Sequence, residues 1–500
     1  MSLASTANRP PLKERIPQGA AALFFIQIFA TLAFAVLYST LVLYTTKKLG
    51  FTAKEATAIM GVFGAFNYGL HLFGGCLGGR FLSNRNLFIF GMILQGIGCA
   101  LIASGTVANL YWGLGMFLTG SGLNVTCINM MLTQRFTPED PRRETAFIWN
   151  YAGMNLGFFI GFAVAGYYQL SENYHALFMF AAIGNVIATV LALLRWKVIA
   201  DTDTPLLQQS SAGFRIRFGI AILILIVLVP VIRSLLQHAD FSNSFVISLG
   251  ILVLLFLIFL TVRHKPLDEK KRMAAYLILA LGSLLFWSLY QLAPMGLELF
   301  AEYNIDRHVM GITIAPQWIQ NINTIVIVIG GPLMTILFNK LRERGWRIDI
   351  PLQFSLSLLL IGAGFLLLPM GISLAGPTGM VAFSWIAWSY VLQSFGELLI
   401  SPIGYAMIGR LAPSRYQGLM MGSWMMVTGV ASVLSSYFSG LMPQHTAGQT
   451  VLETNPGYST VFGHLGWSAV ALAVVLGILI PLLRRLINNS QEQKQAEASA

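Results

Sequence analysis

Apolar stretches long enough to cross a lipid bilayer recur along this chain, separated by short polar segments. A membrane-spanning helix needs about 20 mostly apolar residues. Fourteen stretches meet this description: 20–45, 56–79, 87–103, 110–133, 146–170, 176–194, 218–232, 246–262, 273–297, 318–337, 352–370, 381–407, 419–441 and 461–483. The pattern predicts an all-α polytopic membrane protein with 14 transmembrane helices. The first stretch is too long for a signal peptide, so we expect it to be retained.

A polar segment at 200–212 separates six of these stretches from eight. Each side contains a Gly-rich helix that leads into a basic loop, at 68–80 and at 329–340. Matched features in two halves are typical of transporters built from repeats, and small residues let their helices approach closely. If the two Gly-rich helices hold equivalent places, the stretches at 218–232 and 246–262 are two extra helices. This arrangement predicts a major facilitator fold with two six-helix bundles and an insertion.

The same pattern gives the expected domain organisation. It comprises an N-terminal cytoplasmic tail (1–19), a six-helix bundle (20–199), a linker with two extra transmembrane helices (200–272), a second six-helix bundle (273–486) and a C-terminal cytoplasmic tail (487–500).

The distribution of Lys and Arg orients these helices. With both termini in the cytoplasm, all but five of the 31 Lys and Arg fall on the inner side, the exceptions being Lys47, Lys48, Lys54, Arg233 and Arg307. This bias follows the positive-inside rule. The net charge of +11 therefore reflects topology and contact with anionic membrane lipids. Because the basic residues form no continuous patch, we expect no nucleic-acid partner.

Composition sets the class of protein. The chain is 56% hydrophobic and only 10% charged, which is more apolar surface than a soluble protein of this size could bury. We expect a monomer in the bacterial cytoplasmic (inner) membrane.

The sequence contains no nucleophile–base constellation, no cluster of metal ligands and no nucleotide-binding loop. We therefore expect neither an enzyme, nor a cofactor, nor a metal site.

One carboxylate lies deep within an expected span. Glu397 is flanked by apolar residues on both sides, and an ionisable group at such depth costs roughly 2.5–3.5 kcal/mol on insertion scales. Such a residue normally marks a substrate or proton path, so Glu397 is a candidate for substrate binding and for proton coupling. The alternative is a protonated carboxyl group that holds helices together by hydrogen bonding.

Several motifs resemble those of the proton-coupled oligopeptide transporters, the POT family. The segment 393–401 (QSFGELLIS) resembles the tenth helix of that family. Asn150-Tyr151 followed by Asn155-Leu-Gly157 resembles its fifth-helix signature, and the segment 421–424 (MGSW) resembles part of its eleventh helix. The resemblance extends over nearly the whole chain and implies transport of peptide-like solutes by alternating access.

The resemblance also implies which residues line the solute cavity. Glu397 matches a glutamate that holds the peptide amino terminus, and Asn323 matches an asparagine that meets a peptide terminus. Four further matches concern the cavity wall and the outer gate: Tyr68, Asn155, Trp424 and Trp287.

The first half departs from the family in its charges. The family's first helix carries two glutamates, an arginine and two tyrosines, and an ungapped alignment places Gln27, Ala30, Thr31, Phe34 and Ala35 at these positions. The family's fourth-helix lysine corresponds to Val125, and its seventh-helix carboxylate falls near Gly282. The chain is thus an atypical member, in which Gln27 and Thr31 are candidate neutral binding residues.

These departures leave the mechanism open. A cavity that keeps the glutamate and lacks the cations suits an amine, so di- or tripeptides and amine-bearing peptide derivatives are the expected solutes. Protons are a candidate co-substrate, and their coupling is expected to be atypical or absent. Two alternatives remain, an efflux antiporter for another amphipathic metabolite and a transport-inactive sensor or scaffold with the same fold.

Overall fold

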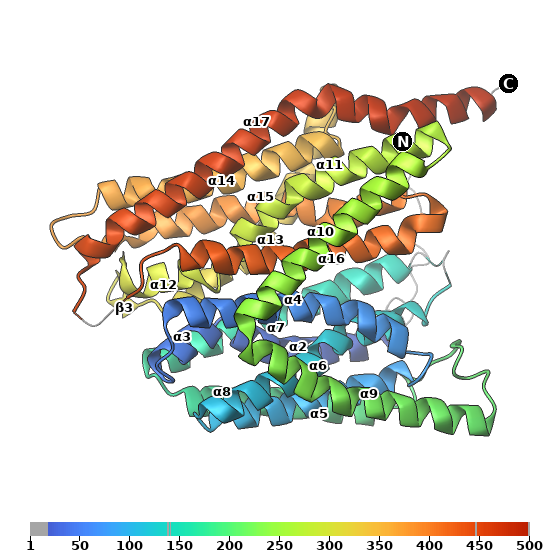
Figure 1. Ribbon diagram of the computed structural model, residues 1–500, viewed down its shortest axis with the longest axis horizontal. Helices are drawn as coiled ribbons and strands as arrows, with labels where there is room; N and C mark the ends of the chain where they lie inside the picture. Colours follow the sequence, from blue (N-terminus) through green and yellow to red (C-terminus); the bar gives the residue numbers. More distant parts are fainter. Residues whose placement is uncertain (1–18, 138–139, 141, 446–447, 499–500) are drawn as a thin grey trace, which may run out of the picture. The chain divides into compact units, whose positions relative to one another are not determined.

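The computed structural model describes residues 19–498 except 138, 139, 141, 446 and 447, and these residues are mainly helical (Figure 1). From the N-terminal side the helices are α2 (Ala20–Tyr38), α3 (Leu41–Lys47), α4 (Ala53–Leu77), α5 (Asn84–Ala103), α6 (Val107–Thr133), α7 (Arg142–Leu170), α8 (Tyr174–Leu194), α9 (Ser211–Gln237) and α10 (Ala239–Arg263). They continue with α11 (Leu267–Tyr290), α12 (Gly296–Tyr303), α13 (Pro316–Glu343), α14 (Ile350–Ser373), α15 (Phe383–Leu411), the 3-10 turn η1 (Ser414–Tyr416), α16 (Gln417–Gly440) and α17 (Val451–Ala498).

Four two-residue strands lie near α12 and the start of α15. The strand β1 (Ile305–Asp306) pairs in parallel with β4 (Val381–Ala382), and β2 (His308–Val309) pairs with β3 (Ile312–Thr313) in an antiparallel hairpin. Gly311, at the turn of this hairpin, has a φ of +81°, a conformation that glycine adopts without steric cost.

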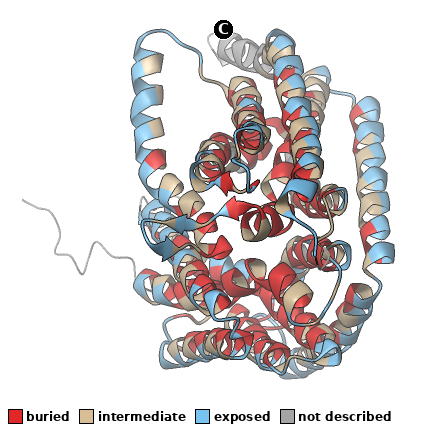
Figure 2. Ribbon diagram, turned by 90° about the vertical axis from the view of Figure 1, so that its left-hand side faces the viewer, coloured by how far each residue is buried: buried red, intermediate tan, exposed pale blue. Residues whose placement is uncertain are grey.

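The contacts divide the chain into two compact units. The first unit comprises residues 1–38 and 70–234, and the second comprises 39–69 and 235–500. In each unit the buried residues lie on the faces where helices meet, and exposed residues cover the opposite faces (Figure 2). The sequence-based domain boundaries stay predictions.

In the first unit, α5 and α6 pack backbone against backbone. A Cβ atom built on Gly98 of α5 would lie 2.6 Å from the carbonyl oxygen of Gly113 on α6, and one built on Gly113 would lie 2.6 Å from that of Gly98. The turn between the helices is short, and Thr106 caps α6 by accepting a hydrogen bond from the Asn109 amide. α2 packs similarly on α7 and also contacts α8.

In the second unit, α14 packs between α15 and α17, and α11 contacts α16 and α17. Aromatic side chains fill the core, including Phe354 and Phe365 of α14 and Phe462 of α17, all of which are fully buried. α10 differs from its neighbours, because its buried residues are only Ser242, Asn243, Leu257 and Thr261 among those described. Its remaining apolar side chains are therefore free to face lipid.

Within the described part of the chain, twelve helices are long and apolar enough to cross a membrane: α2, α4, α5, α7 to α11, α13, α14, α16 and α17. Two further expected spans coincide with α6 and α15, which have similar length but are not among the twelve. Polar residues such as Asn124 and Asn129 reduce the apolar character of α6, and the side chains of α15 are only partly described. The expected stretches at 218–232 and 246–262 lie within α9 and α10.

Three expected element boundaries were wrong. The stretch at 273–297 is not one helix, because α11 ends at Tyr290 and α12 starts at Gly296. The first stretch is broken, because α2 ends at Tyr38 and a new helix starts at Leu41, after Ser39 and Thr40. The last helix starts ten residues before the expected span, at Val451, and continues to Ala498 through most of the expected C-terminal tail. Of the N-terminal tail expected at 1–19, residues 1–18 lie outside the described part of the chain.

Candidate functional site

Glu397 lies in a polar cluster on the facing sides of α13 and α15. The Asn323 side-chain amide donates hydrogen bonds to Glu397 Oε2 (2.7 Å) and to Ser394 Oγ (3.0 Å). Ser394 precedes Glu397 by three residues, a spacing that places both side chains on one face of α15. The Ser394 hydroxyl in turn donates to the backbone carbonyl of Tyr390 (2.7 Å). This cluster joins two helices that each carry one of the expected substrate-binding residues.

Aromatic residues of α11 complete the surroundings of the carboxylate. The side chain of Tyr290 is hydrogen-bonded to Glu397. The ring of Trp287, one turn earlier, lies edge-on to Tyr290 with centroids 5.6 Å apart, and the buried Phe286 stacks on Tyr290. Trp287 Nε1 is buried and has no hydrogen-bond partner among the described residues.

The electrostatic character of this cluster follows from its composition. Asn323 and Tyr290 are neutral donors, and no cation pairs with Glu397 among the described residues. The Glu397 side chain is half-buried rather than fully enclosed. A partly accessible carboxylate without a cationic partner can bind an ammonium group, because a charge-assisted hydrogen bond is about twice as strong as a neutral one.

Three predicted residues lie in the first unit. Gln27 Nε2 donates to Thr31 Oγ1 (2.8 Å) on the buried face of α2. Asn155 of α7 donates to the backbone carbonyl of Tyr151 (2.9 Å). A Cβ on Gly157 would lie 2.9 Å from Thr31 Cβ, so the Asn155-Leu-Gly157 signature packs directly beside the first-helix positions. None of these side chains carries a charge.

Two other predicted residues belong to the second unit. Trp424 of α16 is 3% exposed, belongs to the core cluster, and lies 6.4 Å from the ring of Phe354. A Cβ on Gly404 would overlap its ring at 2.2 Å, so this glycine gives the indole its space. Tyr68 of α4 is half-buried. Substrate binding by either residue stays a prediction.

Comparison with known protein families adds the decisive observation. Residues 85–454 match the model of the POT family. This chain belongs to the POT family. The match covers the cluster around Glu397 and most of both units, and it places the chain among transporters rather than enzymes.

Curated POT relatives align along their whole length. The dipeptide and tripeptide permease A of Cronobacter turicensis is 29% identical over 503 residues, with 99% of each chain covered. The protein of the same name from Escherichia coli K12 is 27% identical over 506 residues, again with 99% of each chain covered. This chain is thus similar to these two permeases over nearly all of its length.

Solved structures of the family agree. A variant of a POT peptide transporter in complex with alafosfalin matches with a TM-score of 0.82 and 27% identity over 94% of this chain and 96% of that one. A POT family transporter in complex with 5-aminolevulinic acid, at 22% identity, matches with a TM-score of 0.79 over 94% of this chain and 99% of that one. These matches confirm the expected all-α major facilitator fold of a multi-pass membrane protein.

The sequence analysis missed two members of the Glu397 cluster, Ser394 and Tyr290. Ser394 lies within the motif that led to Glu397 and shares its helix face, so the spacing of three residues could have identified it. Tyr290 lies one turn beyond Trp287 on α11 and was recognisable as a polar-tipped aromatic residue on the same side. An acidic residue outside this cluster, Glu298, was also missed because it follows the expected span 273–297 by one position.

Proposed function

We propose that this protein is a secondary transporter that moves di- and tripeptides or amine-bearing peptide derivatives across the bacterial cytoplasmic membrane by alternating access. In this proposal Glu397 binds the amino group of the solute, positioned by Asn323 and Tyr290. Gln27, Thr31, Asn155, Tyr68, Trp424 and Trp287 contribute further neutral contacts. Both termini are cytoplasmic, and the transporter is a monomer.

The observation that carries this proposal is the hydrogen bond of 2.7 Å between Asn323 and Glu397. It orients a half-buried carboxylate in a cluster that otherwise contains neutral donors. The names of the relatives support the solute class, since the full-length curated relatives are dipeptide and tripeptide permeases. A sensor or scaffold would gain nothing from an ionisable group at this depth, because burying it is costly.

Proton coupling is proposed to be atypical. The first-helix positions Gln27, Ala30 and Thr31 have no titratable side chains, so this helix cannot take up a proton. Glu397 is the coupling candidate in the substrate-binding cluster. If a proton and a substrate ammonium compete for this carboxylate, the transporter favours exchange of one solute for another.

Solute exchange in proteoliposomes tests the proposed function. Vesicles loaded with unlabelled alanyl-alanine should take up labelled alanyl-alanine from outside faster than empty vesicles, because exchange requires only a substrate site and alternating access. A labelled sugar of similar size should show no difference. If folded, reconstituted protein exchanges no dipeptide, the sensor or scaffold alternative is favoured. Exchange of an amine-free amphipathic metabolite instead would favour the efflux antiporter.

A further inference from the structure

A second buried carboxylate lies on α12, the short helix that follows α11. α12 carries Glu298 and Glu302 one turn apart, and this spacing places both side chains on the same face of the helix. Glu298 is 1% exposed, and the side chain of Glu302 is 9% exposed. α12 is not among the candidate membrane spans of the described chain. Two acidic groups are thus buried side by side at the end of α11.

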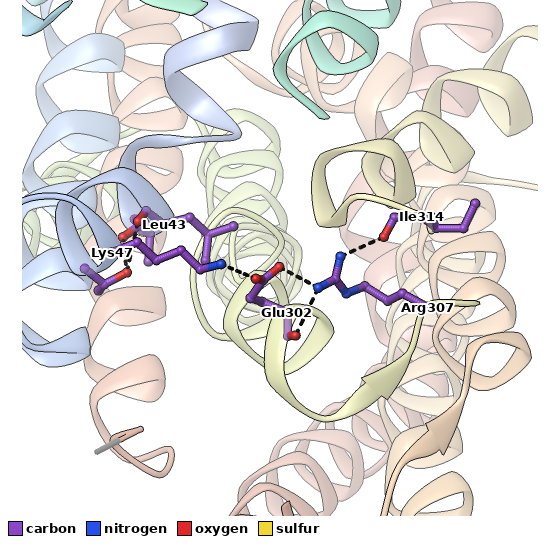
Figure 3. A network of polar contacts seen from close by, with 7 residues as sticks. Leu43, Lys47, Glu302, Arg307 and Ile314 are labelled. Atoms are coloured by element: carbon purple, nitrogen blue, oxygen red, sulfur yellow. Dashed lines mark hydrogen bonds and ion pairs between the residues drawn. The ribbon is translucent and has the colours of Figure 1, made fainter. Parts of the chain in front are cut away.

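Glu302 has cationic partners. It forms an ion pair with Lys47 of α3 and a second with Arg307, whose Nη2 lies 2.9 Å from Glu302 Oε2 (Figure 3). The Arg307 guanidinium also donates to the backbone carbonyl of Ile314 (2.9 Å), which fixes its direction. The negative charge of Glu302 is therefore compensated from two sides.

Glu298 has no comparable partner. Neither of its carboxylate oxygens accepts a hydrogen bond from any described residue. Its own helix carries two further ionisable groups, Glu302 and Tyr303. The neighbouring elements carry Lys47 and Tyr44 on α3, Asp306 and Arg307 at β1, and Tyr390 on α15, which interacts with Glu298 electrostatically. The contacting helix α13 offers only amides in its first two turns, and the one ionisable residue of α16 is Tyr437. Both nearby cations are already paired with Glu302.

The energetics favour a neutral Glu298. An isolated carboxylate taken out of water costs several kcal/mol unless it is paired, whereas a protonated carboxyl group avoids most of this cost. Burial and the neighbouring charge of Glu302 raise the pKa of Glu298 well above its ordinary value. The position of this residue next to an ion-pair network means that its charge cannot change without affecting the network.

We propose that Glu298 is a reversible proton-binding site of this protein, distinct from the Glu397 cluster and linked to the ion pairs of Glu302. The bound proton makes Glu298 a neutral carboxylic acid. Lys47 and Arg307 then pair with Glu302 alone. Loss of the proton creates a second anion one helical turn from Glu302, so the two carboxylates then repel each other and the ion pairs of Glu302 are disturbed. The proton on Glu298 thereby stabilises the contact between α3 and α12. This inference does not depend on the identity of the transported solute.

Infrared spectroscopy of the purified full-length protein tests the proposal without transport. The Glu397→Gln background removes the carboxyl group of the α13–α15 cluster. At neutral pH we expect a carbonyl stretch of a protonated carboxylic acid that disappears on titration to alkaline pH and is absent when Glu298→Gln is added. Asp306→Asn, which removes an exposed carboxylate on β1, should leave this band unchanged. A band that survives Glu298→Gln, or that does not titrate, would overturn the proposal.

Glu302→Gln supplies an independent variant if Glu298→Gln does not fold. Glu302→Gln removes the like charge that disfavours an ionised Glu298, so the pKa of Glu298 should fall. The midpoint of the carbonyl band should therefore move to lower pH. A midpoint that stays the same or rises would show that Glu298 is not linked to this network.

The pH dependence of stability gives a further readout with a definite sign. Because the pKa of Glu298 is higher in the folded than in the unfolded protein, its stabilising contribution is complete below the unfolded value and is lost as the pH rises through the folded value. The thermal stability of the wild type should therefore fall relative to Glu298→Gln as the pH increases. A difference that is independent of pH, or that has the opposite sign, would contradict proton binding at Glu298.

Discussion

Replacing Glu397 with glutamine is expected to weaken the binding of a dipeptide with a free amino group by about tenfold or more. The carboxylate is the one anionic group of its cluster, with Asn323 and Tyr290 as its neutral partners. A charge-assisted hydrogen bond to an ammonium group contributes roughly 1.5–3 kcal/mol, and 1.4 kcal/mol corresponds to a factor of ten in the dissociation constant. Glutamine keeps the size of the side chain and one acceptor oxygen for Asn323, so the substitution removes the charge with little change in shape.

The measurement is dipeptide binding to purified protein by calorimetry, with Glu343→Gln as the matched control. Glu343 is the exposed last residue of α13, whereas Asn323 lies near the start of this helix. Its replacement therefore changes the net charge by the same amount at a site far from the Glu397 cluster. This control should bind as the wild type does. Unchanged binding in Glu397→Gln would remove Glu397 from the substrate site.

Gly98→Ala is expected to destabilise the first unit, whereas Gly96→Ala on the same helix is not. The new Cβ at Gly98 would lie 2.6 Å from the Gly113 carbonyl oxygen and 3.0 Å from the Phe117 amide nitrogen. Both atoms belong to the backbone of α6, so the two helices must separate, and overpacking of this kind costs typically about 1–3 kcal/mol. At Gly96 the nearest atom is the Asn185 Cβ at 3.6 Å, an ordinary contact.

Thermal unfolding of the two variants in the same detergent checks this expectation. Gly98→Ala should melt well below the wild type. Gly96→Ala should melt at or above it, because alanine favours a helix over glycine by up to about 1 kcal/mol. Equal melting temperatures would show that α5 and α6 do not approach as closely as the structure indicates.

The helices were largely predictable from the sequence because lipid requires long apolar segments with internally satisfied backbones. Their ends were less predictable. α2 ends at Tyr38, and the apolar stretch continues from Leu41 in α3. The break does not interrupt the apolar stretch, so the hydropathy pattern did not reveal it. α17 begins in a segment that contains Glu453, Thr454 and Asn455 and looks like a loop. Its start is held by distant contacts, such as the hydrogen bond of 2.7 Å from Asn455 to the Gly379 carbonyl.

The candidate site was predictable only in part. Glu397 was identifiable because a charge within an apolar stretch is conspicuous, and the family resemblance pointed to Asn323. Their direct hydrogen bond spans 74 residues of sequence and could not be derived from spacing. Glu298 was missed because it stands one position after an apolar stretch, where a glutamate normally contacts water. Its burial depends on the packing of α12 against α3, α13 and α16, which no local pattern encodes.

We propose that the substrate is held by its amine at Glu397, in a cluster whose described residues offer no cation to its carboxylate. The most direct test compares one dipeptide in free, N-acetylated and C-amidated forms for binding to the wild-type protein. We predict that acetylation weakens binding by about tenfold or more and that amidation is neutral or favourable, because desolvating an unpaired carboxylate costs several kcal/mol. Much weaker binding of the amidated form than of the free acid would contradict the account, since a cation would then have to reach the bound carboxylate.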